Sequence, residues 1–227
     1  NLKIKKLENV KKELLQKMFA DKDDLVPKIR FDGFEDEWEE KKFSELIKLK
    51  SFRNTDLFYK YDDVFSVSND YGIVNQIKFL GRSFAGESLQ NYKVVEPTDI
   101  VYTKSPLTNF PYGIIRSNNS EKTGIVSVLY AVYESKPNFV SNFMELYFTL
   151  SYRINNFLYS IISKGAKNTI NISDRAFFDK SILVPNLQEQ QKIAKLFTTL
   201  DNVIKLNKQK LEKLQNIKKT LLQKMFV

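Results

Sequence analysis

The hydrophobic pattern is most regular at the C-terminal end of the chain. From Gln188 to Phe226 a seam of positions recurs at alternating intervals of four and three, with no Pro or Gly in between. Its members are Ile193, Phe197, Leu200, Ile204, Asn207, Leu211, Leu214, Lys218, Leu221 and Met225. This spacing predicts a helix roughly 50 Å long that packs lengthwise against another helix. Asn207, a lone polar residue amid the apolar seam, is expected to fix the register and partner of that pairing.

The start of the chain repeats the end of this helix. Residues Lys6–Phe19 and Lys213–Phe226 are identical at eleven of fourteen positions, at a constant offset of 207. The identity extends to polar positions, which a generic amphipathic helix would not conserve, so this is an internal repeat. We expect the chain to contain one full repeat unit, preceded by the C-terminal end of another repeat unit. The favoured interpretation is a piece of a longer protein; the alternative is a natural half-size protein that dimerises through the seam.

The middle of the chain predicts a strand-rich body. Short alternating segments bounded by turn residues indicate strands at 63–68, 92–95, 100–104, 112–116 and 182–185, and 38–49 is a short helix or a strand. Gly124–Glu134 is apolar on both faces and predicts one central strand. Asn138–Ser163 has helical spacing and predicts a core helix. The expected fold is α+β, with a mixed, strand-rich domain carried on long helices.

Four segments follow from this pattern: residues 1–20 end a first helix, 21–37 form a linker, 38–186 form the body and 187–227 form the long helix. The net charge of +9 is concentrated in the helices, where 1–20 and 187–227 together carry fifteen Lys against five acids. Basic helices suit a phosphate backbone, although lysine stems also cover apolar surface on ordinary solvated faces.

Several kinds of chemistry are disfavoured. The chain has no Cys and no His, which argues against disulfides, zinc and the commonest general base. We therefore expect no metal and no cofactor. No apolar run is long enough to cross a membrane and no signal peptide is visible, which is compatible with a cytoplasmic protein.

Two segments imitate catalytic motifs. Gly81–Ser88 has the glycine spacing of a phosphate-binding loop, but Glu87 stands where Lys is needed, so a loop or bulge is the better interpretation. Asp36, Glu39, Glu40 and Lys41 fit a metal-dependent nuclease pattern, yet that pattern is short and common. We expect a solvated face there and find no catalytic constellation.

The motifs together resemble the specificity subunit of type I restriction-modification enzymes. The helical signature is the most specific part: Val184–Ala194, Leu200-Asp201, Lys210–Leu214 and Lys218–Phe226. Pro27–Trp38 resembles the family's entry into a target recognition domain. Weaker signatures are Thr98–Tyr102, Gly124–Ser127 and Gly165–Lys167.

This resemblance implies a non-catalytic, DNA-binding bacterial protein. Family members carry two target recognition domains, each of which reads half of a split site in double-stranded DNA. Conserved helices separate the domains, pair as an antiparallel coiled coil, and dock the methyltransferase subunits and, through them, the restriction subunits. This chain departs from the pattern because it has one body, so it resembles a C-terminal half or a half-size subunit. It would leave methyl transfer and cleavage to those partners.

The candidate DNA contacts rest on side-chain type and expected loop placement. Arg suits guanine, Asn suits adenine and cations suit phosphates. The set is Arg53, Asn69, Tyr71, Lys78, Arg82, Lys104, Arg116, Asn118, Lys164, Lys167 and Asn168. The rival interpretation is a coiled-coil adaptor whose globular head binds protein and has no DNA specificity.

Overall fold

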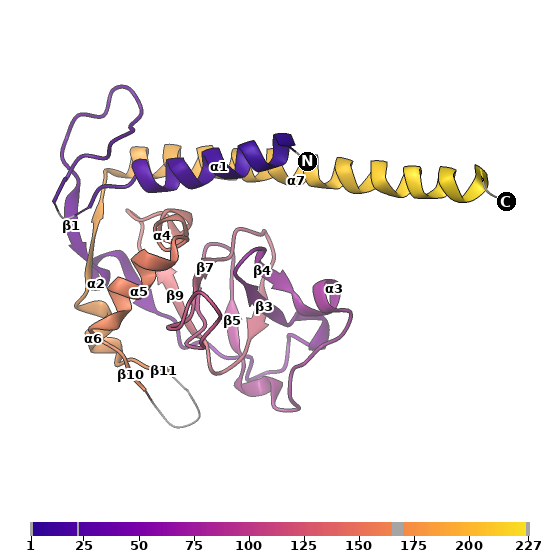
Figure 1. Ribbon diagram of the computed structural model, residues 1–227. Helices are drawn as coiled ribbons and strands as arrows, with labels where there is room; N and C mark the ends of the chain where they lie inside the picture. Colours follow the sequence, from indigo (N-terminus) through magenta and orange to yellow (C-terminus); the bar gives the residue numbers. More distant parts are fainter. Residues whose placement is uncertain (1, 22, 165–169, 226–227) are drawn as a thin grey trace.

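The long helices pack side by side along one edge of the molecule. The computed structural model describes residues 2–21, 23–164 and 170–225. Helix α1 (Leu2–Lys17) lies along the first half of helix α7 (Leu187–Met225), and the second half of α7 continues past the start of α1 (Figure 1). The ammonium of Lys11 lies 2.5 Å from the Asp201 carboxylate, and Lys208 lies 2.7 Å from Glu8. Moving from Asp201 to Lys208 along α7 corresponds to moving backwards along α1, from Lys11 to Glu8. The two helices are therefore antiparallel.

Apolar side chains of both helices form the buried side of this pair. Ile4 and Leu15 are buried on α1, and Ile193, Phe197 and Ile204 are buried on α7. The predicted long helix and its antiparallel pairing are confirmed. The Asn207 amide donates to the Val203 carbonyl of its own helix, at 2.7 Å, and its expected role in register stays a prediction. Charged contacts such as Lys11–Asp201 also bridge the pair.

Among the described residues, the body is built from five small antiparallel sheets rather than one large sheet. The largest has the order β2 (Ile47–Leu49), β9 (Ala131–Ser135), β6 (Ile100–Tyr102) and β7 (Ile115–Ser117). The others pair β1 (Glu39–Lys42) with β12 (Ser181–Val184), β3 (Phe65–Ser68) with β4 (Gly72–Asn75), β5 (Lys93–Val95) with β8 (Gly124–Val126), and β10 (Ser163–Lys164) with β11 (Ile170–Asn171).

Short helices fill the spaces between these sheets. They are α2 (Phe43–Leu46), α3 (Gln76–Leu80), α4 (Ser141–Tyr147), α5 (Ser151–Tyr159), α6 (Asp174–Phe178) and the 3-10 turns η1 (Tyr61–Asp63) and η2 (Leu89–Asn91). The predicted α+β class is confirmed, with strands and helices interleaved around a common core.

Aromatic side chains join the helix pair to the body. Phe19, just after α1, lies 6.5 Å from Phe197 of α7 and 5.2 Å from Phe143 of α4, measured between ring centroids. Trp38 lies 5.7 Å from Phe143 and is buried. Burial of such large rings is the main source of stability at a junction of this kind. We call Phe19, Trp38, Phe143 and Phe197 the aromatic joint.

Two predicted elements are each split in two. The predicted strand Gly124–Glu134 is wrong as a single strand, because a turn at 127–130 sends β8 and β9 into different sheets. In that turn the Ser127 hydroxyl accepts from the Leu129 amide, at 3.3 Å. The predicted helix Asn138–Ser163 is two helices, because Leu150 has extended backbone between α4 and α5.

A buried ion pair holds the linker against the start of α7. The Arg30 guanidinium donates to both carboxylate oxygens of Glu189, Nε to Oε1 at 2.8 Å and Nη2 to Oε2 at 2.9 Å. The Arg30 side chain is 10% exposed and that of Glu189 is 1% exposed. A two-point contact of this kind fixes orientation as well as distance. It therefore sets how the chain enters β1 relative to the helix.

We predict that Glu189→Ala is strongly destabilising because it leaves the Arg30 charge buried without its partner. Removal of one member of a buried pair costs about 3–5 kcal/mol of unfolding free energy. Denaturant unfolding followed by circular dichroism measures this loss. The exposed Glu212→Ala on the same helix is the control and should change stability by less than about 0.5 kcal/mol. Equal small effects for both variants would show that the ion pair is dispensable.

Candidate nucleic-acid interface

The β3–β4 hairpin, α3 and the loop after it form one exposed unit of the body. The hairpin pairs Phe65 with Asn75 and Ser68 with Gly72, which leaves residues 69–71 as its tip. Gln76 ties the unit together: its amide donates to the Ser66 hydroxyl, at 2.9 Å, and its carbonyl oxygen accepts from the Phe84 amide, at 2.6 Å. We call residues 65–84 the hairpin module. Its internal hydrogen bonds hold a loop that would otherwise be free to move.

Aromatic rings and cations occur together on the surface of the hairpin module. Tyr71, 67% exposed, packs on exposed Phe79 with ring centroids 5.0 Å apart. The Arg82 guanidinium lies 4.5 Å from the ring centroid of exposed Phe84, and Lys78 is exposed on α3. Flat rings next to cations are the usual means of holding bases and phosphates. The sequence analysis identified Tyr71, Lys78 and Arg82 as candidate DNA contacts but missed Phe79 and Phe84. The position of these two aromatic residues on either side of Gly81 could have indicated them.

A second group of cations lies around β5. The backbone of Arg53 pairs with that of Lys93, and the Lys93 ammonium donates to the Tyr130 carbonyl, at 2.5 Å. Burial lowers the pKa of Lys93, the positive charges of Lys104 and Arg53 lower it further, and the negative charge of Asp174 raises it in part. The structure therefore brings the candidates Arg53 and Lys104 near Lys93, which sequence reasoning missed. Cations that repel one another in this way favour an anion between them.

Two candidates are unsuited to contact bases. Arg116 is 3% exposed, and its guanidinium donates to Asn69 and to the Ile115 carbonyl. Asn118 is buried, and its amide donates to the carbonyls of Glu96 and Lys122. Buried polar groups with full sets of internal partners hold structure together. We therefore withdraw both from the set of base contacts.

The remaining candidates lie in different places. Asn69 is half-buried at the hairpin tip, where its Oδ1 accepts from Arg116. Lys164 ends β10, and its side chain lies outside the described part of the chain, as do Lys167 and Asn168 altogether. The structure therefore does not test the predicted DNA contacts of Lys164, Lys167 and Asn168.

The helix seam changes character along α7. Ile193, Phe197 and Ile204 are buried, and Leu200, Asn207 and Leu211 are partly buried. Leu214, Leu221 and Met225 are exposed, as is the nearby Ile217. The first half of the seam therefore has its partner, and the second half presents an apolar face to solvent.

The two imitations of catalytic motifs are surface features. Gly81, with φ of 79°, ends α3, and the segment that follows is loop as far as η2. Glu39 and Lys41 form an ion pair of 2.6 Å on β1. In residues 2–21, 23–164 and 170–225, no group of three or more metal-binding side chains is placed to hold an ion. Within the same residues no helix has the length and apolar character needed to span a membrane.

Comparison with known proteins identifies the family. Residues 35–216 match the family model described as the type I restriction modification DNA specificity domain. The match spans the whole body and most of α7, so the chain belongs to the type I restriction modification DNA specificity family.

Individual relatives agree with this assignment. The chain is 30% identical over 124 residues to the putative type I restriction enzyme MjaX specificity subunit of Methanocaldococcus jannaschii, an alignment that covers 48% of this chain and 28% of that protein. It shares its fold with the S subunit of a type I restriction-modification system from M. genitalium, with a TM-score of 0.56 and 16% identity. That alignment covers 96% of this chain and 54% of the S subunit. For the HsdS subunit from Thermoanaerobacter tengcongensis, the TM-score is 0.50 and the identity is 15%. That alignment covers 91% of this chain and 46% of the HsdS chain. The chain thus spans about half the length of these solved relatives.

We predict that Lys93 loses its proton at lower pH than the other lysines, and that Lys104→Met raises the pKa of Lys93 by removing a nearby positive charge. Titration of lysine side chains by nuclear magnetic resonance measures both. Lys195→Met on α7 is the control and should leave the pKa of Lys93 unchanged.

The ammonium group of Lys93 also makes the stability of the fold depend on pH. Because the pKa of Lys93 is lower in the folded than in the unfolded chain, its charged form destabilises the fold. That penalty is full below the folded-state pKa, falls as the pH rises above it, and is gone once the pH exceeds the ordinary pKa of an unfolded lysine. An unaltered Lys93 pKa in Lys104→Met would contradict the proximity of the two cations.

Proposed function

We propose that this chain recognises one half of a split target in double-stranded DNA, as part of the specificity subunit of a type I restriction-modification complex. The observation that carries the proposal is the family match across 35–216, which includes the exposed hairpin module and the cation group around β5. In this account residues 38–186 form the target recognition domain, 1–20 and 187–227 form the spacer helices, and 21–37 link them.

Cationic side chains and aromatic rings would contact different parts of the DNA. Lys78, Arg82 and the group of Arg53, Lys93 and Lys104 would neutralise phosphates, which gives affinity without sequence information. The exposed rings of Tyr71, Phe79 and Phe84 would make apolar contacts with base edges in the groove, such as the methyl group of thymine. A phosphate beside these cations would offset the repulsion among Lys93, Lys104 and Arg53, which adds to the affinity.

The internal repeat supports a second, matching half of the molecule. Leu15 in α1 is 3% exposed, whereas its counterpart Leu222 in α7 is 44% exposed; for Met18 and Met225 the values are 3% and 75%. The same sequence is therefore covered in one copy and uncovered in the other. The first copy lies along α7 from Phe197 to Lys208, and its buried residues Leu15 and Met18 also belong to the core that the body shares.

The tail of α7 is accordingly expected to pack on a helix that resembles the first half of α7. Lys218, the counterpart of Lys11, would there meet an acid like Asp201. Two sources can supply this helix: a preceding segment of the same protein or a second copy of this chain. Both place two bodies at opposite ends of an antiparallel pair, which suits two half-sites of opposite orientation.

Catalysis and docking follow from this arrangement. The bodies and helices would position methyltransferase subunits on the DNA, and methyl transfer and cleavage would belong to those subunits and their restriction partners. Such a complex acts on chromosomal DNA, which places it in the bacterial cytoplasm. A protein adaptor without DNA specificity is the alternative, and it predicts no salt-dependent affinity for DNA.

We predict a steep salt dependence of duplex DNA binding by the full-length protein. Fluorescence anisotropy with a 40-base-pair duplex, measured across salt concentrations, gives the slope of log affinity against log salt. Loss of two phosphate contacts in Lys78→Ala/Arg82→Ala should reduce the steepness of this slope by about 1.8. Lys41→Ala/Lys42→Ala removes the same charge on β1 and should leave the slope unchanged. Absence of binding, or equal slopes for both pairs, would favour the adaptor.

We predict that Leu222 becomes as important as Leu15 once the second helix is present. In the full-length protein each change to Ala should cost about 2–5 kcal/mol, as expected for a buried leucine. In monomeric 227-residue protein, Leu15→Ala should keep that cost, whereas Leu222→Ala should cost less than about 0.5 kcal/mol. Denaturant unfolding measures all four values, and sedimentation at increasing concentration detects pairing of two copies. A negligible effect of Leu222→Ala in every assembly would remove the partner helix from the account.

A further inference from the structure

The two copies of the repeated segment are similar enough to compete for one binding surface. Lys6–Phe19 and Lys213–Phe226 share eleven of fourteen residues, and the first copy lies along the first half of α7. A surface that accepts the first copy is therefore expected to accept the second. The three differences are Glu8 against Gln215, Val10 against Ile217 and Glu13 against Thr220. A preference of α7 for one copy of the segment must come from these positions.

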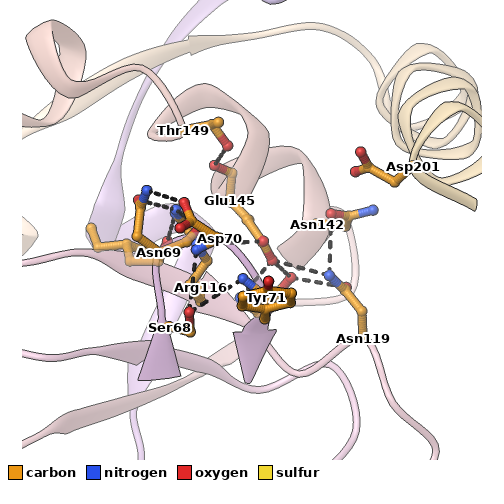
Figure 2. Close-up of polar contacts among 12 residues, drawn as sticks. Ser68, Asn69, Asp70, Tyr71, Arg116, Asn119, Asn142, Glu145, Thr149 and Asp201 are labelled. Carbon is orange, nitrogen blue, oxygen red and sulfur yellow. Dashed lines mark hydrogen bonds and ion pairs between the residues drawn. The ribbon is translucent and has the colours of Figure 1, made fainter. Parts of the chain in front are cut away.

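The contacts that the two copies share fix where a copy lies on α7, but not which copy. The Lys11 ammonium lies 2.5 Å from the Asp201 carboxylate of α7, and the second copy has Lys218 at the corresponding position. Figure 2 shows Asp201 on α7 apart from the hydrogen-bonded side chains of the body, so a lysine of either copy could reach it. The buried Leu15 also recurs, as Leu222. The second copy thus has both the charge and the apolar side chain that this surface requires.

Two of the three differences alter no recorded contact with α7 among the described residues. Glu13 forms its ion pair within its own helix, with Lys17 at 2.6 Å. Its counterpart Thr220 donates to a backbone carbonyl of its own helix, at 3.0 Å. Val10 and its counterpart Ile217 are both exposed. These two differences therefore leave the surface of α7 without a means to distinguish the copies.

Glu8 is the difference that reaches α7. The Lys208 ammonium lies 2.7 Å from Oε1 of Glu8, and both side chains are partly exposed at the edge of the helix pair. Charged pairs beside the apolar seam of paired helices determine the choice of partner and its orientation. Gln215, the counterpart of Glu8, has no charge to place next to Lys208. The two copies thus offer α7 the same apolar face, but only the first completes this ion pair.

We propose that Glu8 is a specificity-determining residue, which makes the first half of α7 bind α1 in preference to the tail of α7 (residues 213–225) from a second copy of the chain. Two α7 helices packed in this way would form a symmetric antiparallel pair, because each tail would cover the first half of the other helix. That pair would displace α1 from both chains and would place Gln215 of each copy opposite Lys208 of the other. Every self-paired dimer thus lacks two ion pairs that α1 supplies, which is specificity through a poorer fit of the wrong partner. Of the two sources of a partner helix for the tail, this disfavours the second copy, and it does not depend on whether the body reads DNA.

The first test gives the tail the charge that it lacks. An exposed ion pair changes an equilibrium constant by roughly 1.4- to 5-fold, and Gln215→Glu creates two such pairs in each self-paired dimer. The association constant of the 227-residue chain, measured by sedimentation equilibrium, should therefore rise by roughly 2- to 30-fold. High salt should reduce this rise, because it screens exposed charges. Gln223→Glu is the matched control: it adds the same charge to the tail, its counterpart Gln16 is exposed on α1, and it should leave the constant unchanged.

Hydrogen exchange shows whether the tail takes the place of α1. Helix α1 has 16 residues, and an isolated helix of that length is only marginally stable in water. As Gln215→Glu associates, the backbone amides of α1 should lose protection while those of residues 213–225 gain it. Mass spectrometry of proteolytic fragments follows both segments in the same sample.

An exchange of charges gives a second and larger effect. In Lys208→Glu/Gln215→Lys, position 208 repels Glu8 of α1 and attracts the tail of the other copy. This variant should associate more tightly than Gln215→Glu. Thermal melting of dilute samples confirms that each variant is folded, as expected for changes at exposed positions.

Three results would overturn the proposal. Equal association constants for Gln215→Glu and Gln223→Glu would show that the charge opposite Lys208 does not select the partner. Association that leaves the amides of α1 protected would show that the tail binds elsewhere. No association of any variant at the highest soluble concentration would show that the tail does not compete with α1.

Discussion

The packing of α1 against the first half of α7 is the contact on which the rest of the molecule depends. It buries the side of α7 that carries Phe197, and through Phe19 and Phe143 it joins the helices to the body. The Arg30–Glu189 pair then fixes the linker that leads from α1 into β1. Without α1 and the Phe19 that follows it, the aromatic joint would lose one of its four rings, and the body would be held to the helices by its contacts with α7.

This arrangement explains how a small body can act at a defined distance. The helix pair is stiff because its contacts continue from Phe19 to Glu8, and the body is attached along the same stretch. The exposed tail of α7 extends the same seam without a partner among the described residues. A second body held by the same geometry would be turned relative to the first, as a split DNA target requires. Recognition would then depend on loops such as the hairpin module, and spacing on the helices and their attachment.

The sequence predicted what periodicity and identity can reveal. The seam from Ile193 to Ile204 and the repeated Lys6–Phe19 segment predicted a long helix packed lengthwise against another, and the family resemblance supplied the antiparallel direction. Local patterns were less informative in the body, because Gly124–Glu134 is apolar on both faces whether it is one strand or two. Only the tertiary structure shows that Ser127 begins a turn there.

Side-chain roles were the hardest to predict. Arg116 and Asn118 have the residue types of base contacts, but β7 and the residue after it lie inside the body, where both side chains bind internal partners. Phe79, Phe84 and Lys93 were missed because exposure and the neighbourhood of other cations are properties of the folded chain. Tyr71 and Arg82 were found because short polar loops beside glycines tend to be exposed.

The central claim is that residues 38–186 read one half of a DNA target while the helices fix its place. The most direct measurement replaces the corresponding domain of a full-length specificity subunit of known target with residues 38–186, and maps the methylated bases in cells that also contain its methyltransferase subunits. The account predicts that one half of the recognised sequence changes, while the other half and the position of the split are retained. An unchanged target, or loss of both halves in a protein that still assembles, would contradict it.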